Sequence, residues 1–298
     1  MYLCKPNLTF KICIVRMIMK RTIIFFCAAL LLAGLEGCSG DGKKNRVKSV
    51  SDSDSQVASD VTNVVYTKYG IPLPVDLFKY LVNEDITYNN DLLIPLENMD
   101  RYTKETKQAM VLGAYSADIA YCSLYKRQQE VMGYFNCAFK LADKLDISEG
   151  FNFRYVERME SNVNSADSLS NIAGESYWKA CNYLNDNEKN NILPFVIYGG
   201  WVESQYLTVA SNDLKSTREQ IMNQREGLLS LINYLYEVMI ESSAFYYNYD
   251  IKHIIMDLNN IKKVYDKVAD NNIDAQSYND ICNKIKTMRT ELIDPNKN

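Results

Sequence analysis

The chain contains a single histidine, His253, among 298 residues, and only two tryptophans and six prolines. One histidine excludes a zinc site built from several histidine ligands. The sequence also lacks a glycine-rich phosphate loop, a G-x-S-x-G nucleophile elbow and an H-E-x-x-H metal motif. It therefore shows none of the motifs that mark the common nucleotide, serine and zinc hydrolases, and it predicts no cofactor and no catalytic residue.

A run of acidic and amide residues near the C-terminus does not meet the requirements of a calcium loop. Asp270, Asn272 and Asp274 match three early positions of an EF-hand. However, Ala275 stands where the sharp turn needs glycine, and Ile281 stands where the loop needs a bidentate glutamate. A capped connection between two helices explains these residues better, and no metal site is predicted.

The first forty residues have the pattern of an export signal. The basic Met19-Lys20-Arg21 precedes an apolar run from Ile23 to Leu35. This run is too short to span a bilayer, because a spanning helix needs about 20 apolar residues. Residues 1–18 have the character of an upstream extension, and we expect initiation at Met17 or Met19.

The end of the apolar run resembles the lipobox of bacterial lipoproteins. Leu35 stands at the aliphatic position, Gly37 at the small position and Cys38 at the lipidated position, whereas Glu36 departs from the usual small or neutral residue. The resemblance covers about the first 40 residues. It implies removal of residues 1–37 and attachment of acyl chains such as palmitate at Cys38, and two or more chains anchor a protein stably. An uncleaved anchor and an ordinary secretory signal are the alternatives.

The residues after Cys38 extend this interpretation. Ser39 stands where aspartate would retain an enteric lipoprotein at the inner membrane, so the resemblance implies the cell envelope, and the outer membrane more than the inner. Residues 39–60 are polar, which is typical of a flexible tether. The leader holds five of the 33 basic and one of the 37 acidic residues, so its removal leaves a net charge of about −8. We expect the membrane and an envelope protein as partners, and no nucleic acid.

Residues 61–298 are predicted to form one helical domain. Apolar residues recur at the spacing of a buried helix face, and short breaks rich in Asn and Asp separate the segments. The expected helices lie near residues 75–82, 102–125, 127–145, 152–163, 166–186, 191–210, 215–241, 250–269 and 275–293. The fold class is therefore all-α, a single bundle of about eight or nine antiparallel helices, with solenoid-like helix pairs as the alternative.

Two of these segments, 110–125 and 192–210, are apolar on nearly all sides, which is typical of helices in the middle of a bundle. Gly113 and the pair Gly199-Gly200 lie inside them, where a missing side chain lets a neighbouring helix approach closely. Each segment also carries one carboxylate, Asp118 or Glu203, with aromatic residues nearby. The candidate ligand-binding residues are Asp118, Glu203, Tyr115, Tyr121, Trp201 and Tyr206.

A carboxylate in apolar surroundings must be paired or hydrogen-bonded, or its pKa rises until it is neutral. If Asp118 and Glu203 face each other, they could bind a polar ligand or act as acid and base in glycoside hydrolysis. Alternatively, each accepts a hydrogen bond from a tyrosine or an arginine and fixes the helix register, which is the commoner arrangement.

Four cysteines follow Cys38, each on an apolar helical stripe: Cys122, Cys137, Cys181 and Cys282. Buried thiols behave as small hydrophobes, which favours four free thiols over two disulfides, although an envelope location permits disulfides. The aromatic segment from Phe245 to Tyr249 is either an exposed patch for a sugar ring or a partner, or a set of rings that packs the next helix. His253 stands at helical spacing from Asp250 and Asp257, which indicates a surface histidine paired with carboxylates.

The sequence favours a non-enzymatic, membrane-tethered module that binds another envelope protein, which predicts a continuous aromatic surface patch and no deep pocket. One alternative is a lipoprotein that binds a small ligand or glycan in a cavity around Asp118 and Glu203. A less favoured alternative is a glycan hydrolase, which requires those carboxylates about 5–9.5 Å apart in an open cleft.

Overall fold

The computed structural model describes residues 70–83, 86–151, 154–162, 165–187, 189, 191–211, 214–268 and 272–297. The chain divides into two units, residues 1–51 and 52–298, and all described residues belong to the second. The expected signal peptide, Cys38 and the tether lie outside the described residues. Within the described ranges, no helix has the length and apolar character needed to cross a membrane.

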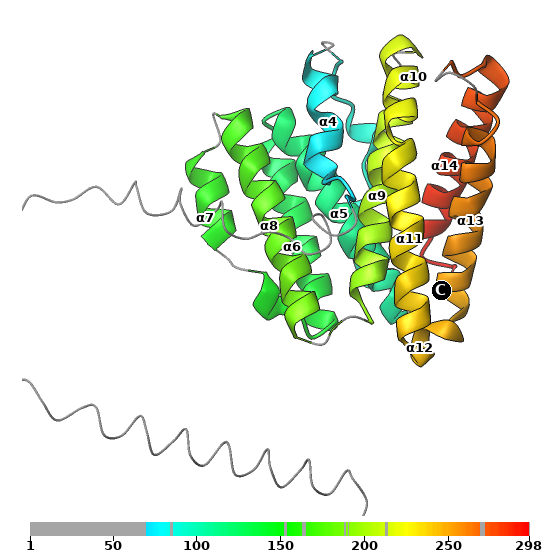
Figure 1. The fold of residues 1–298 in the computed structure, drawn as a ribbon. Coiled ribbons are helices and arrows are strands. Elements are labelled where there is room, and N and C mark those ends of the chain that lie inside the picture. Colours follow the sequence, from blue (N-terminus) through cyan, green and yellow to red (C-terminus); the bar gives the residue numbers. More distant parts are fainter. Residues whose placement is uncertain are drawn as a thin grey trace, which may run out of the picture. The chain divides into compact units, whose positions relative to one another are not determined.

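The described residues form an all-α fold, as the sequence predicted, with no strand among them (Figure 1). The α-helices of this part of the chain are α4 (Pro74–Asn83), α5 (Glu105–Leu124), α6 (Gln128–Lys144), α7 (Arg154–Ser161), α8 (Ala166–Asp186), α9 (Leu193–Ala210), α10 (Leu214–Asn223), α11 (Arg225–Glu241), α12 (Ser243–Tyr246), α13 (Tyr249–Tyr265) and α14 (Ala275–Ile293). Three short 3₁₀ helices are η1 (Asn90–Leu92), η2 (Leu96–Arg101) and η3 (Ser148–Gly150).

The described helices outnumber the predicted segments for two reasons. The predicted helix at 215–241 is two helices, because α10 ends at Asn223 and α11 begins at Arg225. Gln224 between them keeps helix-like geometry, with φ −81° and ψ −5°. The residue at the break is neither proline nor glycine, and the sequence therefore gave no signal of it. The second reason is α12, a single turn within a segment that the sequence placed between helices.

Local signals set several helix ends. Pro194 lies in the first turn of α9, where its missing N–H leaves no hydrogen bond unmade. The Asp274 carboxylate accepts a hydrogen bond from the Ser277 N–H at 2.8 Å and caps α14. Asn248 caps α13 in the same way, through the Ile251 N–H at 3.1 Å. Side-chain caps therefore fix the starts of α13 and α14, which both contribute to the site described below.

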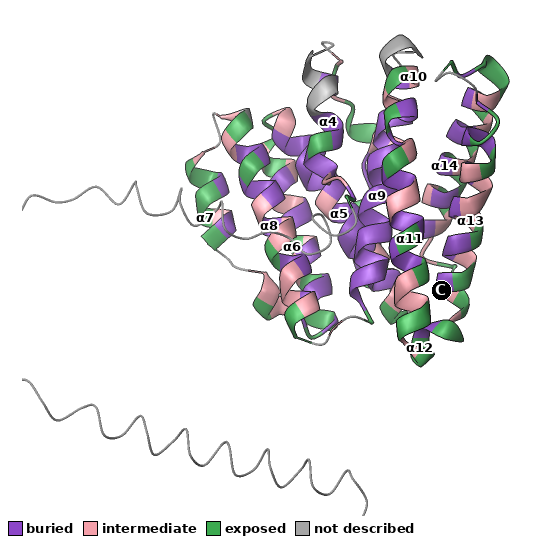
Figure 2. Cartoon of the chain, viewed as in Figure 1, coloured by how far each residue is buried: buried purple, intermediate pink, exposed green. Residues whose placement is uncertain are grey.

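The centre of the bundle is the pair α5 and α9. Every residue of α9 except Tyr206 and Ala210 is buried, and Figure 2 shows this helix covered along most of its length. Helices α4, α6 and α8 pack on α5, whereas α14 packs on α9 and also against α13. The two segments that are apolar all round in the sequence are thus the two central helices.

Helices α5 and α9 approach each other backbone to backbone at two glycines. A Cβ atom on Gly113 would overlap the carbonyl oxygen of Val196, and a Cβ atom on Gly199 would overlap the carbonyl oxygen of Met110. Only glycine has no Cβ, so the crossing requires glycine at both positions. The close approach predicted from the sequence is confirmed.

The four cysteines of the described region form no disulfide with one another. Cys122, Cys181 and Cys282 are buried, and Cys137 is half-buried. Burial raises the pKa of the Cys181 thiol to about 12, so it stays protonated and packs as a small apolar group. The free thiols favoured from the sequence are confirmed.

Candidate functional site

Glu203 on α9 is held by a buried ion pair. Its carboxylate has no exposed surface and accepts two hydrogen bonds from Arg289 of α14, at 3.1 Å from Nε and 3.3 Å from Nη2. The same Nη2 donates to the carbonyl oxygen of Leu92 at 2.9 Å, and the guanidinium lies 4.3 Å from the ring centre of Tyr206. Arg289 therefore joins α9, α14 and the end of η1.

Asp118 on α5 is equally buried but has no cationic partner of its own among the described residues. Its Oδ2 accepts a hydrogen bond from the Ile94 N–H at 3.3 Å, and its Oδ1 has no hydrogen-bond partner within the described ranges. Burial, and then the charge of Glu203, raise the pKa of Asp118 well above 3.8, although Arg289 opposes the shift. Burial also raises the pKa of Glu203, against the effect of Arg289. The environment of Asp118 favours the neutral acid.

The four aromatic residues predicted to surround these carboxylates have separate roles. The Tyr121 hydroxyl accepts a hydrogen bond from the Asn89 N–H at 3.1 Å. The Tyr115 hydroxyl and the Trp201 Nε1 are buried without a partner in the described part of the chain. Tyr206 is half-buried and lies against Arg289.

The arrangement around Glu203 matches the structural alternative, because an arginine pairs with it, whereas Asp118 accepts a backbone N–H instead of a tyrosine or arginine. Neither carboxylate has exposed surface, and the hydrogen bonds that they accept come from the protein itself. Together they fix α5 and α9 against α14 and the segment from Leu92 to Ile94. Ligand binding or glycan hydrolysis at these two residues would require this part of the core to open.

Replacing Asp118 with asparagine should make the stability less dependent on pH. The folded-state pKa lies above the unfolded value of about 3.9, so unfolding releases a proton and wild-type stability falls as pH rises above about 4, by at most about 1.4 kcal/mol per pH unit. Asparagine keeps an acceptor for the Ile94 N–H and carries no proton. We expect D118N to melt at or above the wild-type temperature at pH 8, with the advantage shrinking towards pH 4, measured by circular dichroism.

An exposed aspartate provides the control for this substitution. Asp143 lies on the surface of α6, and D143N should keep the wild-type dependence of melting temperature on pH. If D118N lost stability between pH 4 and 8 as steeply as wild type, the group that titrates in the core would be a different one.

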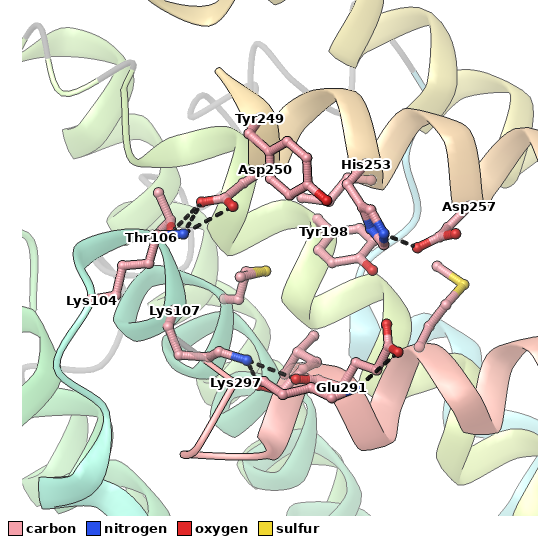
Figure 3. Close-up of a pocket in the computed structure, with 14 residues that line it drawn as sticks. Lys104, Thr106, Lys107, Tyr198, Tyr249, Asp250, His253, Asp257, Glu291 and Lys297 are labelled. Atoms are coloured by element: carbon pink, nitrogen blue, oxygen red, sulfur yellow. Dashed lines mark hydrogen bonds and ion pairs between the residues drawn. The ribbon is translucent and has the colours of Figure 1, made fainter. Parts of the chain in front are cut away.

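A second group of residues surrounds a surface cavity of about 460 Å³. It lies between the start of α5, α9, α13 and the end of α14 (Figure 3), and its volume is in the range of about 300–1,000 Å³ typical of small-ligand sites. None of the six candidate residues from the sequence lines it. The lining residues are Lys104, Thr106, Lys107, Met110, Tyr198, Tyr249, Asp250, His253, Ile254, Asp257, Met288, Glu291, Leu292 and Lys297.

One wall of this cavity is fixed by Asp250, in the first turn of α13. Its carboxylate forms an ion pair with Lys104 at 2.7 Å and accepts a hydrogen bond from the Thr106 hydroxyl at 2.7 Å. Burial opposes the ionised form, but the hydrogen bonds from Lys104 and Thr106 outweigh it and hold the pKa of Asp250 below 3.8. This contact joins the start of α5 to the start of α13.

The opposite wall is formed by the end of α14. Lys107 Nζ donates to the carbonyl oxygens of Glu291 at 2.7 Å and Leu292 at 3.1 Å, which satisfies acceptors that a helix end leaves free. Burial lowers the pKa of Lys107. Lys297 forms an ion pair with the Glu291 carboxylate at 3.0 Å. Both lysines are therefore held in place before any ligand arrives.

His253 follows Asp250 by one turn of α13 and pairs with Asp257 one turn later. Its Nδ1 is 3.1 Å from the Asp257 carboxylate, as the sequence spacing indicated. Burial raises the pKa of Asp257, and the charge of Glu291 adds to the effect, whereas His253 opposes it. Burial likewise raises the pKa of the Tyr198 hydroxyl, and Asp257 and Glu291 reinforce the shift. Acceptors and donors thus gather around one space (Figure 3).

One exposed tyrosine, Tyr249, lies at the edge of this cavity, and two more precede it in the chain. Tyr249 lines it, is 76% exposed, and has its ring centre 5.9 Å from that of His253. Tyr246 and Tyr247 in the preceding segment are also exposed, whereas Phe245 is buried against Phe195 with ring centres 6.2 Å apart. Phe245 thus packs, but against α9 rather than against the start of α13 as the sequence suggested, and the three tyrosines are exposed.

The sequence drew attention to Asp250, His253 and Asp257 of α13 only as a surface histidine with carboxylates, and it gave no sign of the cavity residues from α5 and α14. The cavity joins Lys107 of α5 to the chain around Glu291 and Lys297, which is more than 180 residues away in the sequence. No local sequence pattern predicts that these two segments meet. Lys107 and Lys297 have the spacing of ordinary surface lysines. In the described part of the chain, no cluster of three or more histidine, cysteine or acidic residues is suited to hold a metal ion.

Comparisons of the chain with protein-family models, curated proteins and solved structures found no match.

Proposed function

We propose that this protein is a lipid-tethered, non-enzymatic binding protein of the cell envelope that holds a small ligand in the cavity between α5, α9, α13 and α14. The observation that carries the proposal is the cavity itself, about 460 Å³ with polar groups already fixed by hydrogen bonds. Groups ordered in advance lose little entropy on binding. The sequence from Leu35 to Cys38 supports the lipid tether, and Ser39 supports an outer-membrane location.

The lining chemistry favours binding over catalysis. The lining residues include no serine and no cysteine, and the one hydroxyl from threonine, on Thr106, donates to Asp250. The lysines are engaged as well: Lys104 with Asp250, and Lys107 with backbone carbonyls. A nucleophile would first have to lose the contacts that hold the walls together.

A second candidate function is the docking of an envelope protein, and exposed apolar side chains at the end of α11 and around α12 favour it. Ile240 is 75% exposed, and Tyr246 and Tyr247 are exposed in the turn that follows. Large exposed apolar groups that lie together mark interaction surfaces. This function would use the surface rather than the cavity.

Mass spectrometry of the protein extracted from membranes tests the proposal. We expect the wild-type chain to begin at an acylated Cys38 and to release a small molecule on denaturation. M110W fills the cavity, because the half-buried Met110 lines it, and should release none. M256W is the matched control, since Met256 is exposed on α13 and does not line the cavity.

Two results would count against the proposal. An unmodified thiol at residue 38, or a retained leader, removes the lipid tether. Equal release from wild type and M110W, or none from wild type, removes the cavity as the binding site.

A further inference from the structure

The charges that line the cavity balance each other. Three lysines and three carboxylates line it: Asp250 pairs with Lys104 and Glu291 with Lys297, whereas Asp257 pairs with His253 and Lys107 bonds to backbone carbonyls. A charged ligand that displaced Lys104 would leave the Asp250 carboxylate, which is only 19% exposed, without its cation. The lining therefore disfavours anions and cations and favours an uncharged ligand.

The lining of the cavity also presents both hydrogen-bond donors and hydrogen-bond acceptors. The ammonium groups of Lys104 and Lys297 can only donate, and the carboxylates of Asp257 and Glu291 can only accept when ionised. Each carboxylate has about four acceptor sites, so one ion pair leaves capacity for further bonds. A hydroxyl group both donates and accepts. A ligand that carries several hydroxyls matches such a wall without any charge of its own.

The same cavity has apolar surface for a ring. Met110, Ile254 and Met288 contribute apolar side chains to the lining. The ring of Tyr249 is largely exposed at the edge and lies beside His253, tilted by 36° relative to it (Figure 3). A sugar ring combines an apolar face of C–H groups with an edge of hydroxyls, so it can lie on a tyrosine while its hydroxyls reach polar groups.

We propose that the cavity binds an uncharged sugar. The ring lies against Tyr249, and its hydroxyls bond to the Asp257 and Glu291 carboxylates and to the lysines of the wall. This inference rests on the proposed binding function and names its ligand class. Tyr249 is the platform that gives the ring its orientation, and the balanced charges exclude acidic and basic sugars.

Saturation-transfer NMR with methyl glycosides tests this inference on the chain from residue 38 onwards with serine in place of Cys38. The probes are the methyl glycosides of glucose, galactose, mannose and N-acetylglucosamine, with methyl glucuronide and methyl glucosaminide as charged counterparts of the glucoside. We expect transfer to the ring protons of at least one neutral glycoside, and at least tenfold weaker transfer to both charged ones at equal concentration.

Two tyrosine variants locate the binding site. Y249S should weaken the neutral glycoside at least tenfold, because it removes the platform. Y247S is the matched control: Tyr247 is 79% exposed two positions earlier and does not line the cavity, so binding should be unchanged. Both residues are exposed, and circular dichroism will establish that both variants are folded.

Three outcomes would overturn the sugar assignment: no transfer to any neutral glycoside, stronger transfer to a charged one, or equal effects of Y249S and Y247S. If M110W still abolishes release of the native small molecule, the binding function stands and only the ligand class is wrong. If M110W changes nothing, the binding function itself is wrong.

Discussion

Replacing Arg289 with methionine should lower the free energy of unfolding by about 3–5 kcal/mol. Methionine has a similar length but no charge, so the Glu203 carboxylate would stay fully buried with no cation beside it. The carbonyl oxygen of Leu92 would also lose its donor. Urea unfolding followed by circular dichroism will measure the loss.

A second substitution separates the ion pair from simple packing. Combining R289M with E203L removes both charges, and buried apolar pairs are often as stable as the ion pair they replace, so most of the loss should be recovered. Arg158 and Glu175 form an exposed pair at 2.8 Å, and R158M should cost less than about 1 kcal/mol. A double variant as unstable as R289M alone would show that the guanidinium acts through its contacts with Leu92 and Tyr206 instead.

The two buried carboxylates could be predicted from the sequence, but their partner could not. Asp118 and Glu203 stand in segments with apolar residues on all sides, so burial follows from local composition alone. Arg289 stands in an amphipathic helix and is 86 residues from Glu203. Periodicity indicates which face of a helix is buried but not which residue of a distant helix meets it.

The cavity was beyond prediction for a related reason. The cavity lies where the start of α5, the start of α13 and the end of α14 come together without filling the space between them. Its presence depends on how the connecting segments orient these helices. The exposure of Tyr249 depends on α12, a single turn that directs Phe245 into the core and leaves the neighbouring rings outside. The composition of the segment indicated aromatic rings, but not which of them would be covered.

Close helix approach at Gly113 and Gly199, in contrast, was predicted from the glycine positions, although not that α5 and α9 approach each other there. Replacing Gly199 with alanine should lower the free energy of unfolding by about 3 kcal/mol, since overpacking of this kind costs up to that amount or more. The added Cβ would overlap the carbonyl oxygen of Met110, and a backbone oxygen cannot rotate away as a side chain can. We expect the melting temperature to fall by roughly 6–12 °C in calorimetry.

Gly174 on α8 is the matched control, because it is also a helical glycine at a helix interface. Its added Cβ would meet a methyl group of Val75 at 3.2 Å, which can shift, and alanine favours the helix by about 1 kcal/mol. G174A should therefore stay within about 1 kcal/mol of wild type. If G199A were as stable as wild type, α5 and α9 would have to lie farther apart than described.

Met110 and Tyr198 line the cavity next to this crossing. Separation of the two helices should thus displace these two lining residues, and G199A should also release less of the bound small molecule than G174A.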